Sequence, residues 1–246
     1  MENRLILGAG SGIGAALARR IARAETRLLL HTGRNREGLE AVARDCRADG
    51  AEVDLCLGDM GAPEPFVEIG KWLDTVPDGG LIGLVFAAGY ARLGPVTETP
   101  VDAVAQALQA MPVAFHRLVA LAAPKLAPER GRVVCVSAFG AHRAKTHNYS
   151  ATAPAKSAME AQVMSFAASF APRGITVNAV VPGFIQKEPG TPSSLTPEQW
   201  THVTEGIPMG RIGRREEVAS AIEYLLSQDA GYITGQAIHV NGGLTL

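Results

Sequence analysis

The chain lacks an excess of either charge, and it lacks long apolar runs. Its 246 residues include 23 Lys and Arg against 24 Asp and Glu, a formal net charge of −1. Nucleic acids and anionic membrane surfaces select basic proteins, so this balance argues against both as partners. No apolar run approaches the roughly 18 residues of a membrane span, and the first residues lead into a short strand rather than a signal peptide. We therefore expect a cytoplasmic protein.

Cysteine is also scarce. Cys46, Cys56 and Cys135 are odd in number, widely spaced and without a Cys-x-x-Cys pair. This pattern is typical of reduced thiols rather than a disulfide framework or a zinc site. The sequence predicts no disulfide and no bound metal.

Glycine, by contrast, is concentrated near the N-terminus. The run Gly8-Ala9-Gly10-Ser11-Gly12-Ile13-Gly14 follows an apolar strand-like segment and precedes a helix-like one. Glycines in such a turn let the backbone approach a pyrophosphate, while the next helix directs free N–H groups and its positive dipole end at the phosphates. The alternative is a tight turn without a ligand. We expect a dinucleotide site whose cofactor contacts are Gly8, Ser11, Gly12, Ile13 and Gly14.

Short β-like runs alternate with Ala- and Leu-rich segments along the chain. The expected strands are 4–7, 27–31, 52–57, 81–86, 132–136, 176–180 and 236–240, and the expected helices are 12–24, 36–49, 64–75, 101–109, 113–126, 155–171 and 214–227. This alternation predicts an α/β fold, a doubly wound parallel sheet with helices on both faces. Right-handed crossovers give seven strands in the order 3-2-1-4-5-6-7, in a single domain spanning residues 1–246.

Residues 184–209 interrupt the alternation. The segment carries Pro189, Pro192, Pro197 and Pro208, which makes it too irregular for a core element. It follows a strand end, where ligands bind in such sheets, so we expect a substrate lid. A plain surface loop is the alternative.

Eight short motifs, in order along nearly the whole chain, resemble the short-chain dehydrogenase/reductase family, whose fold is of the Rossmann type. They are Gly8-x-x-x-Gly12-Ile13-Gly14, Gly58-Asp59-Met60, Ala88-Gly89, and the segments 131–134, 156–160, 173–178, 181–185 and 233–236 with 240–243. The resemblance implies an NAD(P)-dependent oxidoreductase that moves hydride between a nicotinamide and a carbonyl or alcohol. It also implies a homodimer or homotetramer, assembled through the helices at 113–126 and 155–171.

The same resemblance assigns roles to individual residues. Asp59 is expected to contact the adenine, and Lys156 to hold the nicotinamide ribose. The remaining cofactor contacts that it implies are Ala88, Gly89, Pro182, Gly183 and Ile185.

The choice between NADP and NAD depends on the run His31-Thr32-Gly33-Arg34-Asn35. It contains no acid to hold the ribose hydroxyls of NAD, whereas Arg34, with Thr32, suits the 2′-phosphate of NADP. Ser11, however, stands where many NADP-preferring relatives place a second basic residue. We expect NADP rather than NAD; in the alternative, Arg34 is a solvated side chain at the start of a helix.

The catalytic pattern of the family is not kept. Thr152 stands where the resemblance implies a tyrosine, four residues before Lys156. An aliphatic hydroxyl does not ionise near neutral pH as a phenol can. Ala138 stands at the serine position, and Ala110 or Met111 at the asparagine position.

Other residues are candidates for the missing groups. Tyr149 is the best candidate acid, because Pro154 favours a helix that begins only near Thr152 and leaves Tyr149 in a loop. A bulge would be needed to turn Ser137 into the site, since it precedes Ala138 by one residue. His142 or His147 would supply a group that titrates near neutrality. Each has a plainer interpretation, as a packed aromatic, a buried hydroxyl or an exposed loop histidine.

Three functions therefore stay open. The first is an oxidoreductase with displaced catalytic groups, and the second is a pseudoenzyme that serves as a subunit beside an active relative in a hetero-oligomer. The third is non-redox chemistry, of a lyase, dehalogenase-like or cyclase kind, on the same scaffold. Cofactor binding and turnover discriminate between the first two.

Overall fold

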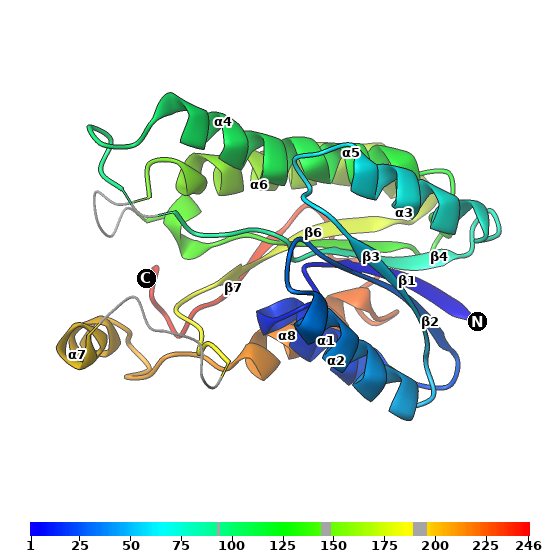
Figure 1. Ribbon diagram of the computed structural model, residues 1–246, viewed down its shortest axis with the longest axis horizontal. Coiled ribbons are helices and arrows are strands. Elements are labelled where there is room, and N and C mark those ends of the chain that lie inside the picture. Colours follow the sequence, from blue (N-terminus) through cyan, green and yellow to red (C-terminus); the bar gives the residue numbers. More distant parts are fainter. Residues whose placement is uncertain (93, 144–148, 189–195) are drawn as a thin grey trace.

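The computed structural model describes residues 1–92, 94–143, 149–188 and 196–246. Seven strands form one parallel sheet in the order β3-β2-β1-β4-β5-β6-β7, which confirms the expected fold (Figure 1). The strands are β1 (Glu2–Leu7), β2 (Thr26–Thr32), β3 (Glu52–Leu57), β4 (Leu81–Phe86), β5 (Arg132–Val136), β6 (Thr176–Pro182) and β7 (Ala237–Val240).

The central strands are apolar on both sides because helices cover both faces of the sheet. In β1, Leu5 and Leu7 pack into one core cluster while Ile6, between them, packs into the other, and all three are fully buried. Each large apolar side chain buried in this way contributes about 1.5 to 3 kcal/mol. Cys46, Cys56 and Cys135 are buried, free thiols within these two clusters.

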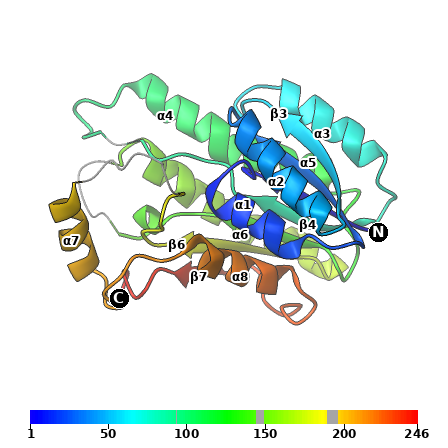
Figure 2. The same ribbon diagram turned by 60° about the horizontal axis from the view of Figure 1, so that its bottom comes forward.

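Helices form one layer on each face of the sheet (Figures 1 and 2). One layer holds α1 (Gly12–Ile21), α2 (Arg36–Ala48) and α8 (Arg215–Leu226), and the other holds α3 (Glu64–Asp74), α4 (Val101–Leu108), α5 (Ala114–Ala122) and α6 (Thr152–Phe170). A further helix, α7 (Pro197–Glu205), lies apart from both layers at the end of the molecule near the C-terminus. It has no fully buried residue, as expected for a segment outside the core.

The chain between α4 and α5 differs from the sequence prediction of two separate helices. A π-helical turn, η1 (Gln109–Val113), joins them without a break. Pro112 in this turn has no N–H to donate, and wider turns of this kind accommodate such an interruption. The Pro112 carbonyl accepts a hydrogen bond from Gln162 Nε2 at 3.0 Å, which ties the turn to α6.

Two kinds of feature are not found within the described ranges. No helix there is long and apolar enough to cross a membrane. Those same residues include no group of three or more His, Cys, Asp or Glu that is arranged to hold a metal.

Candidate active site and cofactor cleft

The glycine turn between β1 and α1 has almost no room for side chains where it packs. A Cβ on Gly8, which has φ +82°, would stand 2.6 Å from Ala88 N, and a Cβ on Gly14 would stand 2.3 Å from Gly8 O. Gly12 differs: its φ is +60°, and no heavy atom of the described chain lies within 4 Å of where its Cβ would be. The turn is therefore tight against the sheet and open on the side from which a pyrophosphate would approach.

A cleft of about 1000 Å³ opens beside this turn, at the carboxyl edge of the sheet. Most of the residues predicted to bind the cofactor line it together: Gly8, Ser11, Gly12, Ile13, Gly14, Arg34, Asp59, Ala88 and Gly89. Ligands of doubly wound sheets bind in this position. The size suits a small-molecule or cofactor site.

The turn after β2 forms one wall of the cleft. Arg34 is exposed there and forms no ion pair with any described residue. Asn35 caps α2 by accepting a hydrogen bond from Gly38 N, and its Nδ2 donates to Gly10 O at 2.7 Å. Thr32 is buried against Gly10: a Cβ added to Gly10 would stand 2.6 Å from Thr32 Oγ1. The arrangement leaves Arg34 as the cation of this wall.

Sequence reasoning missed several residues of the cleft. Tyr90 and Arg92 line it, as do Gln106 and Gln109 from the opposite helix and π turn. Tyr90 follows Gly89 at the carboxyl end of β4, so its place after a strand end was the available signal. Burial raises the pKa of Tyr90; nearby Arg92 lowers it and Asp59 raises it.

Lys156 lies on the buried side of α6. Its Nζ donates to the carbonyl oxygen of Val136 at 2.7 Å, and it stands 3.0 Å from where a Cβ on Gly89 would be. Burial lowers the pKa of Lys156 from 10.5 to about 8, while Cys135 and Glu160 act in the opposite direction. This ammonium therefore stands beside the glycine that lines the cleft, where the resemblance places the nicotinamide ribose.

Thr152 is the first residue of α6 and is buried one turn before Lys156. Tyr149 lies outside the helix, as expected, and is half-buried. Its carbonyl accepts from Ala153 N at 3.0 Å, and its hydroxyl bonds to none of the described residues. Burial raises the pKa of Tyr149.

Ser137 continues the ladder of β5, and no bulge precedes it. Its N–H donates to Val180 O at 2.8 Å, and its hydroxyl donates to Glu160 Oε1. Glu160 Oε2 in turn lies 2.6 Å from His142 Nε2. The His142 ring packs edge-on against His239 at 4.6 Å between centroids. Burial, and then His142, lowers the pKa of His239.

The structure does not bring every predicted residue into the cleft. Pro182, Gly183 and Ile185 do not line the cleft. Pro182 is the last residue of β6, and Gly183 N donates to Val240 O at 3.1 Å. Ile185 pairs with Gly213. His147 lies outside the described residues.

Comparison with known proteins identifies the family. The family model described as enoyl-(acyl carrier protein) reductase matches residues 8–245. A 3-oxoacyl-(acyl-carrier-protein) reductase of Aquifex aeolicus is 32% identical over 249 residues, covering 98% of this chain and 96% of its own. A glucose 1-dehydrogenase of Gluconobacter oxydans is also 32% identical, with 98% and 91% covered. The chain belongs to the short-chain dehydrogenase/reductase family.

Solved structures of the short-chain dehydrogenase/reductase family agree with this fold. A member from Serratia marcescens superposes with a TM-score of 0.91 at 26% identity, covering 100% of this chain and 98% of its own. The protein is therefore an NAD(P)-dependent oxidoreductase by family, and small molecules are the substrates of such enzymes. The open side of Gly12 and the cleft beside it fit a nicotinamide dinucleotide.

Proposed function

We propose that the protein is an NADP-dependent reductase that moves hydride between the nicotinamide and the carbonyl carbon of a small-molecule substrate. The observation that carries the choice of NADP is Arg34, a cation on the cleft wall in a turn without an acid. A guanidinium binds a phosphate through charge-assisted hydrogen bonds, which the ribose hydroxyl of NAD does not offer. The names of relatives such as the Aquifex reductase support the direction of reaction.

The bound cofactor would supply the hydride. In our proposal, the glycine turn and Ser11 hold its pyrophosphate and Asp59 its adenine. Lys156 holds the nicotinamide ribose. In the proposal, the nicotinamide end would be bordered by Pro182, the last residue of β6, and by Gly183 and Ile185, which come shortly after it.

For the proton, we propose Tyr149 as the acid and Lys156 as the neighbouring cation. A positive charge favours the ionised phenol and so lowers the pKa that burial raises. Thr152 and Ser137 would support this pair, the first from one helical turn before Lys156 and the second through its bond to Glu160. The proposal requires the Tyr149 hydroxyl to lie within hydrogen-bond reach of Lys156 or of the nicotinamide ribose, directly or through one water, when the cofactor is bound.

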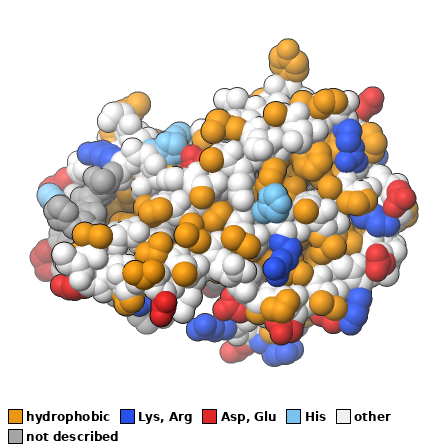
Figure 3. All heavy atoms as spheres, turned by 90° about the horizontal axis from the view of Figure 1, so that it is seen from above, with side chains coloured by type: hydrophobic (Ala, Val, Ile, Leu, Met, Phe, Trp, Pro, Cys, Tyr) orange, Lys and Arg blue, Asp and Glu red, His pale blue; other side chains and the backbone are white. Residues whose placement is uncertain are grey.

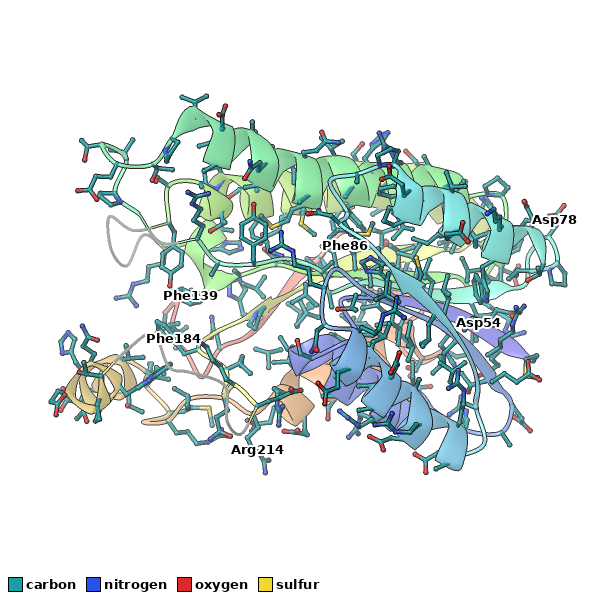
Figure 4. The ribbon with its side chains drawn as sticks, in the orientation of Figure 1. Asp54, Asp78, Phe86, Phe139, Phe184 and Arg214 are labelled. Carbon is teal, nitrogen blue, oxygen red and sulfur yellow. The ribbon has the colours of Figure 1, made fainter. Side chains whose placement is uncertain are left out.

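Residues 184–209 are proposed to cover the substrate. Phe184 packs against Phe139 at 4.8 Å between ring centroids (Figure 4). It also packs against Trp200 of α7, at 6.1 Å between ring centroids. These aromatic contacts connect the segment to the end of β5, beside the proposed chemistry. Residues 189–195 of the segment lie outside the described part of the chain.

A homodimer or homotetramer is also proposed. The helical layer of α3 to α6 carries hydrophobic side chains on its outer face (Figure 3). Among them Val101, Leu108, Val113 and Leu121 are exposed on α4, η1 and α5. Exposed apolar side chains that gather on one face of a protein often mark an interface.

Titration of purified protein with NADPH and NADH, followed by a panel of carbonyl substrates, tests the proposal. We expect tighter binding of NADPH and substrate-dependent oxidation of it. Tight NADPH binding without turnover would favour the second candidate, a subunit of a hetero-oligomer with an active relative. Thr152 and Ala138 at the tyrosine and serine positions are the observation behind that candidate. Substrate conversion without any change in the nicotinamide would indicate non-redox chemistry.

A further inference from the structure

A carboxylate of the chain itself contacts the glycine turn that lines the cleft. Glu188 Oε1 accepts a hydrogen bond from Gly12 N at 3.2 Å. The same oxygen lies 3.1 Å from Nη1 of Arg215. Gly12 begins α1 and Arg215 begins α8, and these two helices pack side by side. One oxygen thus joins a helix N-terminus to a guanidinium.

These two donors are the kind that bind a phosphate oxygen. The amide at the start of a helix carries partial positive charge and faces anions, and a guanidinium forms strong charge-assisted bonds to phosphate. Ser11, at the N-cap position of α1, makes no side-chain cap hydrogen bond. Glu188 therefore supplies the anion for this end of α1. Its side chain is about one-third exposed, so it can leave without unfolding the surroundings.

We infer that Glu188 is an internal competitor for the cofactor's phosphate oxygens, with Arg215 as the cation that serves both anions. The inference rests on the proposed use of this cleft for a dinucleotide, and it adds a determinant of affinity that lies outside the glycine turn. Two anions do not share one amide donor, so a phosphate oxygen takes Gly12 N only after Glu188 has moved. The Arg215 guanidinium, freed from Glu188, then faces the phosphate.

The competition has a thermodynamic consequence. Cofactor binds only the fraction of molecules in which Glu188 has left Gly12, so the measured Kd is the intrinsic Kd divided by that fraction. A neutral side chain of the same shape bonds less strongly to the amide and the guanidinium, and it does not repel phosphate. Removing the charge of Glu188 should therefore tighten cofactor binding. Removing a negative charge that lies far from Gly12 should leave the affinity unchanged, because salt screens surface charges over such distances.

Glu188→Gln tests this directly, because it keeps the shape of the side chain. We expect the Kd for NADPH to fall by about fivefold or more. Glu68→Gln is the matched control: it makes the same charge change on the exposed face of α3 and should leave the Kd within about twofold. A second titration uses inorganic pyrophosphate, monitored by the NMR resonance of the Gly12 amide, and the same tightening is expected.

The two titrations separate the inference from the proposed function. Wild-type protein that bound neither NADPH nor NADH would refute the proposed function, and the pyrophosphate titration would still decide the role of Glu188. An unchanged or weaker affinity of Glu188→Gln for pyrophosphate would overturn the inference. So would an unchanged Kd for NADPH in a protein whose wild type binds it.

Discussion

The Ser137 hydroxyl donates to the Glu160 carboxylate, across the contact between the end of β5 and α6. This bond directs Ser137 toward the helix, and the same carboxylate holds His142. The next residue, Ala138, has extended backbone and no polar group to offer a substrate. The geometry favours a supporting role for Ser137, in the packing of the strand end against the helix that carries Lys156.

Ser137→Ala should therefore change stability more than chemistry. Loss of the donor leaves the partly buried Glu160 carboxylate with one partner fewer, a cost of about 1 to 3 kcal/mol in the free energy of unfolding. Chemical denaturation measures it, with Ser169→Ala on the exposed face of α6 as control. The Kd for NADPH should not change. A loss of turnover by about 100-fold with unaltered stability would instead place this hydroxyl on the substrate.

Arg34→Ala should alter the choice of cofactor. If the guanidinium binds the 2′-phosphate, its removal weakens NADPH binding by about 1.5 to 3 kcal/mol, roughly 10- to 150-fold, and leaves NADH binding nearly unchanged. Fluorescence titration with both cofactors measures this. Arg36→Ala, which removes an exposed cation paired with Glu40 on α2, is the control. Tighter binding of NADH than NADPH by the unmodified protein would contradict the assignment.

Lys156→Met should show how far the buried ammonium lowers the free energy of unfolding, because that effect depends on pH. The folded pKa of about 8 lies below the usual 10.5, so the folded protein binds fewer protons than the unfolded chain above pH 8. The wild type therefore gains stability as pH rises from 8 toward 10.5, and the cost of burial is fully present below that window.

The Met variant carries no such cost. Without cofactor, the difference in free energy of unfolding between this variant and the wild type should shrink by about 1 kcal/mol from pH 7 to pH 9. Denaturation at the two pH values measures the difference. Lys71→Met, which removes an exposed ammonium paired with Glu68, is the control for the loss of a lysine charge. A constant difference for Lys156→Met would mean that the folded pKa is not lowered.

Much of the fold was predictable because short apolar runs alternate with helical segments along most of the chain. β3, β4 and β5 have the predicted bounds, and α2 ends within one residue of its prediction. The continuous passage from α4 to α5 was not predictable. In a sequence, a proline indicates a break between helices. Here Pro112 lies in a π turn, and its carbonyl accepts a hydrogen bond from Gln162, 50 residues away.

The candidate site also has a part that the sequence predicts and a part that it does not. The glycine turn and Arg34 belong to local motifs, so the residues themselves predict the cleft wall. The contact between Gly12 and Glu188 spans 176 residues, and it depends on the path of the chain after β6 ends at Pro182. The partner of Lys156 is a backbone carbonyl, which has no sequence signature. Long-range and main-chain contacts are therefore the part of the site that only the structure supplies.

Tyr149→Phe examines the proposed acid. It removes a single hydroxyl that bonds to none of the described residues, so stability should hardly change. If Tyr149 donates the proton, turnover should fall by at least about 100-fold while the Kd for NADPH stays the same. Steady-state kinetics and a cofactor titration measure both. Tyr232→Phe is the control, since Tyr232 is fully exposed on the loop before β7.

The outcome for Tyr149 also decides between a catalyst and a subunit. Thr152 precedes Lys156 by one turn of α6, so the pair of changes Thr152→Tyr and Ala138→Ser would restore the family pattern on this backbone. In an active enzyme that uses Tyr149, this double variant should gain little. In a chain without turnover, it should create reductase activity on the carbonyl panel. We expect the first result, because a chain with no use for its cofactor would have little reason to keep the glycine turn, Asp59 and Lys156 together.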